Sequence, residues 1–397
     1  MITKPAGAPA RPDRTIGTRR RPLWHAACLC ALALGLAACS SSSPAPGTTR
    51  PATSASGTAT SASPNATSTA PGTDTVGDSD PWIIYEGPVV VPDGTQRAGN
   101  RAVRPDGSGD HWVTPGVPLP VGNKDAWQVH PDWSPNGQRL VFAAADPRQS
   151  AATLTYDLWV SDANGGHLDR VLDCQAPCLE ANYPAWSPNG RSLAFTTFDL
   201  KGQDTVNIRI DVLDLATHHV RTITRAAGTD NVTRPRWSPD GRTLVLEVQH
   251  WSNAGPTGKL TGTAIATVSV TDHVATATVI TPWSMWATYP DWHPTQNLIL
   301  FSTRPWSELD TGPSNLYTAK PDGSHSTQIT HFTNGSTRAT QPTFTPDGSH
   351  IIFTAVEGDG FGNPTMAEIA LDGSGLTSAT SSGPMFGTHP RLRPNVR

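Results

Sequence analysis

One short motif returns at regular intervals along the chain, and this repeat limits the possible folds more than any other feature. Its copies read HPDWSPNGQRLVFAA, YPAWSPNGRSLAFTT, RPRWSPDGRTLVLEV, YPDWHPTQNLILFST and QPTFTPDGSHIIFTA. Each copy has an aromatic anchor, at Trp133, Trp186, Trp237, Trp292 and Phe344. The anchors are 53, 51, 55 and 52 residues apart, and a constant period of this length indicates a repeat architecture.

Each period has the same order of turns and strands. In four of the five copies the anchor precedes a turn with Asn-Gly or Asp-Gly, and both pairs favour a β-hairpin because they accept a positive φ. An apolar strand such as LVFAA follows, then a variable loop, a strand such as YDLWVSD, a second turn and a strand such as STQIT. Four antiparallel strands in about 50 residues form one blade of a β-propeller. We therefore expect the anchors to pack between blades and the turns to build architecture, not chemistry.

The two ends of the folded region complete each other. The stretch from PWIIYEG to HWVTPG supplies the last three strands of a period but has no first strand before it. The C-terminal THPRLRPNV supplies only a first strand, with Leu392 where a sixth anchor belongs. The sequence therefore predicts an all-β, six-bladed β-propeller in which residues 388–397 complete the blade of residues 82–118. Such closure leaves no free sheet edge at the seam.

The motif resembles the WD40-like repeat of TolB-type β-propellers, whose signature is P-x-W-S-P-D-G-x-x-[LI]-x-F. The resemblance covers residues 82–396 and implies the propeller fold. It implies little about function, because function depends on sites and not on folds. TolB itself carries an α/β domain before its propeller, and no such domain is expected here. A role in the Tol-Pal system is therefore not carried over.

The N-terminal 79 residues have a different composition. Three arginines, Arg19 to Arg21, precede an apolar run that is too short to span a bilayer, so residues 1–38 are expected to be an export signal. Leu36 to Cys39 resemble a bacterial lipobox, which implies lipidation of Cys39; a plain signal peptide with a chance cysteine is the alternative. Residues 39–79 are almost entirely Ser, Thr, Ala, Pro and Gly, and predict a disordered tether to a propeller of residues 80–397.

The expected location is the outer face of the cytoplasmic membrane, or the periplasmic side of an outer membrane. In such an oxidising compartment, Cys174 and Cys178 are expected to form a disulfide; a redox pair or a metal clip is the alternative. Residues 39–397 hold 23 basic and 32 acidic residues, a net charge of −9, with no basic stripe. We therefore expect no nucleic-acid partner.

Strand alternation predicts where a site lies. If each first strand starts on one face of the ring, called the upper face, the tight hairpin turns lie on the lower face and the irregular loops lie above, where recognition is common. Three positions before each anchor, a polar or aromatic residue is expected near the mouth of the central channel. These residues are His130, Tyr183, Arg234, Tyr289, Gln341 and His389.

Two of these residues are histidines on neighbouring blades. His130, Gln341 and His389 could together bind a divalent metal, the only cofactor that the sequence suggests. This set is similar to the metal site of propeller-type oligogalacturonate lyases, which have seven blades and a third histidine. The alternative is that these side chains hydrogen-bond to water or to an inserted peptide.

Tryptophans form a second candidate surface in the upper loops of two neighbouring blades. They suit a sugar ring or an apolar protein surface, or else fill space between the loops. The residues are Trp251, Trp283, Trp286 and Trp306. Nearby acids could form a carboxylate pair or stay solvated. They are Asp199, Glu308, Asp310, Glu357 and Asp359.

The chain has no nucleophile-elbow, zinc-protease or P-loop motif. We therefore expect a non-enzymatic envelope lipoprotein that binds an envelope protein or a cell-wall polysaccharide through its upper face. The alternative function is a metal-dependent polysaccharide lyase or hydrolase of the oligogalacturonate type. A purely structural spacer is a third possibility.

Overall fold

A computed structural model of the 397-residue chain describes most of the repeat region. The described residues are 81–90, 96–115, 127–145, 155–201, 204–253, 258–271, 273–303, 313–333, 337–357, 364–380 and 387–394. The predicted signal peptide, the lipidation site at Cys39 and the tether lie outside these residues.

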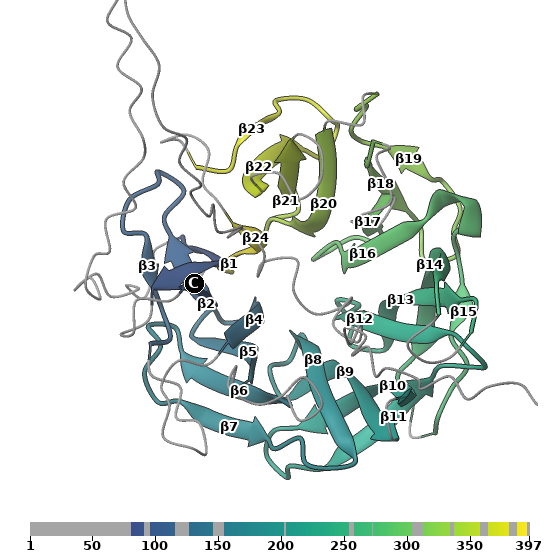
Figure 1. Ribbon diagram of the computed structural model, residues 1–397. Coiled ribbons are helices and arrows are strands. Elements are labelled where there is room, and N and C mark those ends of the chain that lie inside the picture. Colours follow the sequence, from purple (N-terminus) through teal and green to yellow (C-terminus); the bar gives the residue numbers. More distant parts are fainter. Residues whose placement is uncertain are drawn as a thin grey trace, which may run out of the picture.

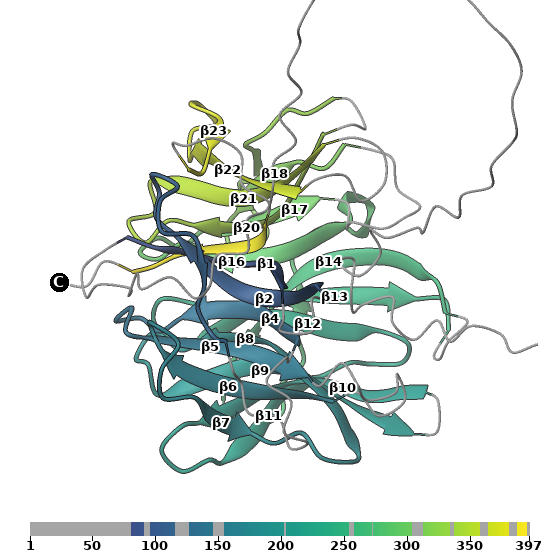
Figure 2. The same ribbon diagram turned by 60° about the vertical axis from the view of Figure 1, so that its left-hand side comes forward.

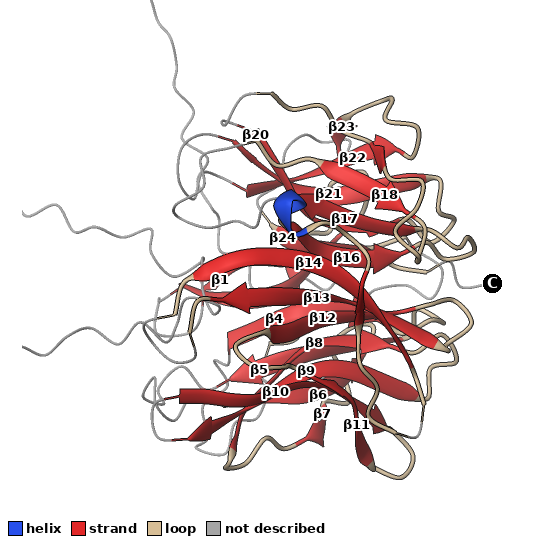
Figure 3. Cartoon of the chain, turned by 90° about the vertical axis from the view of Figure 1, so that its right-hand side faces the viewer, coloured by secondary structure: helices blue, strands red, loops and turns tan. Residues whose placement is uncertain are grey.

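The described chain is an all-β propeller, in which small sheets stand around a common centre like blades (Figure 1). The sheets follow one another around the ring in sequence order, and a view turned by 60° shows their strands stacked beside one another (Figure 2). Within the described part, the helical element is η1, a short 3₁₀ helix at Trp283–Met285 (Figure 3). No helix among the described residues is long and apolar enough to cross a membrane.

Four sheets have four antiparallel strands each. Sheet A contains β24 (Thr388–Leu392), β1 (Ile83–Val90), β2 (Gln96–Val103) and β3 (His111–Trp112). Sheet C contains β12 (Asn231–Trp237), β13 (Thr243–Trp251), β14 (Leu260–Ser269) and β15 (Thr278–Val279). Sheet D contains β16 (Ala287–Trp292), β17 (Ile299–Thr303), β18 (Leu316–Ala319) and β19 (Thr327–Gln328). Sheet E contains β20 (Thr337–Phe344), β21 (His350–Glu357), β22 (Pro364–Ala370) and β23 (Thr377–Ser378).

The remaining eight strands form one sheet, called sheet B. Its first half contains β4 (Trp127–Trp133), β5 (Arg139–Ala145), β6 (Tyr156–Asp162) and β7 (Asp169–Leu172). Its second half contains β8 (Cys178–Trp186), β9 (Ser192–Lys201), β10 (Asp204–Asp214) and β11 (Val220–Arg225). One parallel pair, Tyr156 with Glu180, joins β6 to β8. Strand pairing in the described chain therefore gives four separate four-stranded blades, not the six that the sequence predicted, because this pair merges two repeats into one sheet.

The C-terminal strand closes the ring as expected. β24 pairs with β1 through Ile83–Leu392, Ile84–Arg391 and Glu86–Thr388. Just beyond the strand, the Arg393 N–H donates to the Trp82 carbonyl at 2.7 Å. Segments about 300 residues apart in sequence thus share one sheet, and β1 has a partner on both sides.

The core of the molecule lies between neighbouring repeats, where the anchors pack. Trp186 belongs to a cluster with Val141 of β5 and Phe195 of β9. Two anchors also tie neighbouring repeats by hydrogen bonds: the Trp133 indole donates to the Arg391 carbonyl, and the Trp237 indole to the Ala185 carbonyl, both at 3.1 Å. The anchors are therefore packing residues, as the repeat predicted.

Candidate functional site

Six strands lie nearest the centre of the ring (Figure 1). Each of them contains a residue that is followed by proline. Regular pairing of β4, β8, β12, β16, β20 and β24 shifts there. Proline has no N–H to give to the ladder, so a β-bulge forms. The residue before it takes a positive φ of 50 to 55° in every case. These six, called the bulge residues, are His130, Tyr183, Arg234, Tyr289, Gln341 and His389.

The bulges bring side chains from different sheets together at the centre of the ring. The ring centroid of His130 lies 3.8 Å from that of Tyr183 and 4.7 Å from that of His389. The Tyr289 ring lies 5.7 Å from the His389 ring. Gln341 joins through Oε1, which accepts the His389 backbone N–H at 3.1 Å.

Arg234 links the remaining members of this cluster. Its Nη2 donates to the hydroxyl groups of Tyr183 at 3.1 Å and Tyr289 at 3.2 Å. Its guanidinium carbon also lies 4.6 and 4.2 Å from the centroids of the same two rings, within cation–π range. Its Nη1 donates to Glu247 at 3.0 Å, which neutralises a buried carboxylate. The six bulge residues thus form one group, called the bulge cluster.

Glu86 also belongs to the site, although the sequence did not predict it. This buried residue of β1 accepts the His130 backbone N–H, and its Oε1 lies 3.1 Å from His389 Nδ1 and 3.8 Å from His130 Nε2. Burial alone would raise the pKa of Glu86, but the His389 and His130 imidazoles outweigh this and lower it to about 2. A lone acid in the otherwise apolar stretch PWIIYEG was the available signal.

Behind His130, hydrogen bonds lead to a second buried acid. His130 Nδ1 faces Asn182 Oδ1, which also accepts the Tyr183 N–H at 2.8 Å, and the Asn182 amide donates to Glu180. Burial lowers the pKa of His130 to about 3 and raises the pKa of Glu180 to about 8. His130 is therefore a neutral imidazole at neutral pH, and Glu180 is largely protonated.

A layer of charges lies two residues beyond the bulges. Asp132 lies 3.8 Å from both Arg236 and Arg391, and Asp291 lies 3.9 Å from Arg236 and 3.7 Å from Arg391. Arg391 and Asp291 belong to sheets A and D, which are not neighbours in the ring, so these contacts cross the centre. Burial and the nearby Arg391 lower the pKa of Arg236 to about 10. The alternation in PDW, PRW, PDW and PRL was the sequence signal for this layer.

The candidate tryptophans are only partly gathered. Trp283 is 39% exposed and its ring lies 5.7 Å from that of His250, next to Trp251 on β13. Trp286 is half-buried and ends η1 with a φ of 51°. Trp306 lies outside the described residues.

The predicted acids do not form a carboxylate pair in the described chain. Asp199 is buried and accepts hydrogen bonds from Asn207 and Arg209, each at 3.0 Å. Glu357 is exposed at the end of β21. The other candidates, Glu308, Asp310 and Asp359, lie outside the described residues.

Cys174, in the loop after β7, forms a disulfide with Cys178, the first residue of β8. The Cys174 backbone N–H donates to Asp157 at 2.8 Å, which holds the loop against β6. The disulfide thus constrains the loop that leads from β7 to β8, the first strand in the second half of sheet B.

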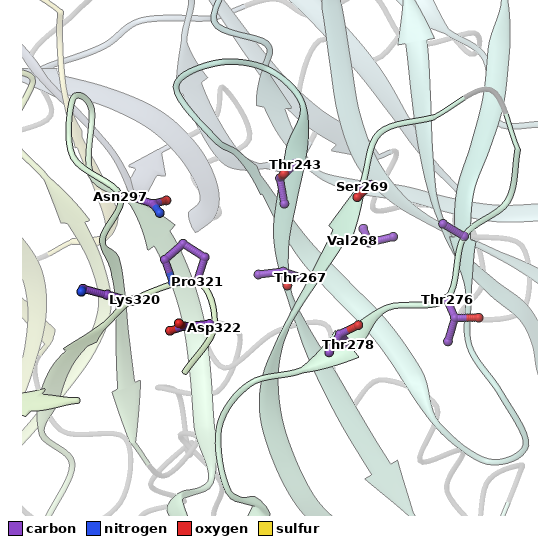
Figure 4. Close-up of a pocket in the computed structure, with 11 residues that line it drawn as sticks. Thr243, Thr267, Val268, Ser269, Thr276, Thr278, Asn297, Lys320, Pro321 and Asp322 are labelled. Atoms are coloured by element: carbon purple, nitrogen blue, oxygen red, sulfur yellow. The ribbon is translucent and has the colours of Figure 1, made fainter. Parts of the chain in front are cut away.

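A pocket of about 450 Å³ lies away from the bulge cluster, between sheets C and D (Figure 4). Thr243, Thr267 and Ser269 line one side, and Asn297 and the Lys320–Asp322 turn face them. These residues lie at the hairpin-turn ends of their strands, which is the lower face. Hydroxyl groups dominate the lining, so the pocket is polar.

Comparison with known proteins adds the fold relationship. No protein-family model matches the chain. The Tol-Pal system protein TolB of Alcanivorax borkumensis is 32% identical over 91 residues, which cover 23% of this chain and 19% of that protein. Dipeptidyl-peptidase 5 of Porphyromonas gingivalis is 26% identical over 136 residues, which cover 32% of this chain and 19% of that protein. The chain thus matches about a fifth of the length of these curated relatives.

A solved structure gives the wider match. TolB from Acinetobacter baumannii superposes with a TM-score of 0.54 at 17% identity, covering 81% of this chain and 68% of that one. The chain therefore has a TolB-like β-propeller fold. Since one sequence relative is a peptidase and another a Tol-Pal protein, the fold does not decide the function.

Proposed function

We propose that this chain is an exported, lipid-anchored propeller that binds an envelope protein or a cell-wall polysaccharide at the bulge cluster on its upper face. The observation that carries the proposal is the convergence of six non-glycine residues in the left-handed conformation, one from each inner strand. Such backbone costs roughly 1–3 kcal/mol per residue and is concentrated at functional sites. The side chains it presents are hydrogen-bonding and aromatic, the types common at recognition sites.

The proposal includes six blades. Each half of sheet B repeats the four-stranded order of the other sheets, and a single residue pair joins the halves. Six of the seven apolar clusters in the described chain support the same count, because one lies between each pair of neighbouring repeats. In this reading residues 80–397 form one ring-shaped domain.

The envelope location rests on the sequence. Residues 1–38 have the pattern of an export signal, Cys39 ends a lipobox-like segment, and residues 39–79 have the composition of a tether. The disulfide between Cys174 and Cys178 suits an oxidising compartment. A relative named for the Tol-Pal system supports an envelope partner without identifying it.

The lyase alternative required Gln341 as a metal ligand beside His130 and His389. Gln341 Oε1 already accepts two hydrogen bonds, from the Thr354 hydroxyl at 2.8 Å and from the His389 N–H at 3.1 Å. Gln341 thus has a structural role in the described chain. The geometry favours recognition over this catalytic set.

The test compares two surfaces of the same molecule. Tyr183→Phe with Tyr289→Phe removes two hydroxyl groups from the bulge cluster and keeps both rings. Lys320→Ala with Asp322→Asn changes the lower-face pocket and serves as the matched control. Binding is measured to purified peptidoglycan by co-sedimentation and to solubilised envelope proteins by cross-linking.

We expect the tyrosine variant to weaken binding about tenfold, since a hydrogen bond to a charged or polar partner contributes about 1.5 kcal/mol. The control variant should bind as the wild type does. Loss of binding in the pocket variant alone would move the site to the lower face. A folded wild-type chain that binds neither preparation would contradict the proposed function.

A further inference from the structure

We propose that Glu86, His130 and His389 bind one divalent transition-metal ion. The three side chains come from β1, β4 and β24, so the site lies where the C-terminal strand closes the ring. This inference does not depend on the proposed function, because metal binding requires neither export nor a macromolecular ligand. It also differs from the set that the sequence suggested, since a carboxylate takes the place of Gln341.

The distances suit a shared ion. One ligand atom from each residue lies within 4.8 Å of the other two. Glu86 Oε1 is 3.1 Å from His389 Nδ1 and 3.8 Å from His130 Nε2. Metal bonds of about 2.1 Å place two ligands of one ion about 3 to 4 Å apart.

The tautomer of His130 directs a lone pair into the site. Asn182 Oδ1 accepts the Tyr183 N–H, and the Asn182 amide donates to Glu180, so the amide orientation is fixed. His130 Nδ1 faces this oxygen and must carry the proton, which leaves Nε2 as the acceptor nitrogen facing Glu86. An outer partner that orients a histidine in this way is typical of metal ligands.

His389 supplies the second imidazole. Its side chain is 15% exposed, its Nδ1 lies 3.1 Å from Glu86 Oε1, and within the described residues its Nε2 has no hydrogen-bond partner. Buried polar atoms usually have partners, and an exception calls for an explanation such as a missing ion. A bound metal supplies that partner for one nitrogen.

Glu86 lacks the arginine partner that an equivalent glutamate, Glu247, has. The two glutamates occupy equivalent positions, since Glu86 pairs with Thr388 and Glu247 with Thr233, both next to a bulge. Glu247 is neutralised by Arg234. In the described chain, the ion-pair partners of Glu86 are His130 and His389 alone. A cation held between these three groups compensates the buried carboxylate.

The donor set indicates the class of metal. Two imidazoles and one carboxylate occur at catalytic zinc sites and at non-haem iron(II) sites, with the other coordination positions open. Open positions would let the ion bind an oxygen of a ligand seated on the bulge cluster. Zn²⁺ is the probe for the test because it is not redox-active.

The experiment uses the full chain with a tag that contains no histidine. The thiols of Cys28, Cys30 and Cys39 are alkylated first, because free thiolates bind zinc. After removal of metal by a chelator, Zn²⁺ is titrated by calorimetry into the wild type, Glu86→Gln, His389→Gln and His250→Ala. His250 is the control, an exposed histidine paired with Asp230. Circular dichroism establishes the folding of each variant beforehand.

We expect one Zn²⁺ per wild-type chain and an affinity at least about 100-fold lower in both ligand variants. Loss of a residue that only hydrogen-bonds to a metal ligand already lowers metal affinity about 10–100-fold, and loss of a ligand itself should lower it at least as much. The His250 variant should match the wild type. If Glu86→Gln does not fold, His389→Gln still tests the site, because in the described chain the His389 ring has no polar side-chain contact except the one with Glu86. A folded wild type that binds no Zn²⁺, or binding that neither ligand variant weakens, would overturn the proposal.

Discussion

At the scale of the residue, backbone conformation and burial decide the chemistry of the centre. The six bulge residues all have a positive φ at a β-bulge, and this places their side chains in one cluster. Burial and the neighbouring groups then give two buried acids different protonation states. Glu86 has imidazole neighbours and stays ionised, whereas Glu180, whose hydrogen-bond partner in the described chain is the Asn182 amide, keeps its proton.

The raised pKa of Glu180 predicts a specific pH dependence of stability. In the unfolded chain this carboxyl ionises near pH 4.3, but in the folded protein it holds its proton up to about pH 8. Folding therefore takes up a proton in this window, and the stability contributed by the group falls as pH rises through it. Glu180→Gln should remove a decline of up to about 1.36 kcal/mol per pH unit between pH 5 and 8.

The measurement is urea unfolding of the wild type and Glu180→Gln across that pH range. The difference in the free energy of unfolding should grow in favour of the variant as pH rises. Glu357→Gln changes an exposed glutamate and should leave the wild-type profile unchanged. Profiles of wild type and Glu180→Gln that run parallel would show that Glu180 is ionised in the folded protein.

At the scale of the element, β24 holds the ring closed. It gives β1 a second partner, places Leu392 in a cluster with residues of sheets A and E, and accepts the Trp133 indole through the Arg391 carbonyl. Without it β1 would be an open sheet edge, and such edges are prone to pair with other chains.

Deletion of residues 388–397 should therefore destabilise the whole domain. We expect a loss of at least about 5 kcal/mol, a large part of the stability of an ordinary domain, together with aggregation. Thermal unfolding followed by circular dichroism measures the effect. The control is deletion of residues 395–397 alone, which keeps β24 intact. Equal melting temperatures for the two truncated chains would contradict a closing role for the strand.

At the scale of the whole molecule, the centre of the ring and its lower face carry different groups. The bulge cluster and the crossing charges of Asp132, Arg236, Asp291 and Arg391 fill the centre, while the described pocket lies at the hairpin-turn end. The proposed tether and lipid would leave this ring free to orient either end toward a partner. Its negative charge suits partners other than nucleic acid.

Replacement of Cys39 tests the anchor. Cys39→Ser should abolish incorporation of labelled fatty acid and move the protein from the membrane fraction to the soluble fraction, because the acceptor thiol is gone. Cys28→Ser changes a cysteine within the expected signal peptide and should leave the label in place. Retention of label in Cys39→Ser would show that the lipid is attached elsewhere and would contradict lipidation at Cys39.

The sequence by itself determined the repeat, the β-propeller fold, the turns, the anchors and the closure by residues 388–392. It could do so because these features depend on local patterns: a fixed spacing, Asn-Gly and Asp-Gly turns, and an unpaired first strand. It also identified the six positions of the bulge cluster, since each stands three residues before an anchor.

Tertiary structure alone decided the chemistry at those positions. The pair Tyr156–Glu180 merged two repeats into one sheet, and Glu86 met two histidines from other strands, neither of which a local pattern encodes. The Gln341 Oε1 accepted hydrogen bonds from the Thr354 hydroxyl and the His389 N–H. Local pattern fixes where a strand turns, but which charges meet depends on how separate strands pack around one centre.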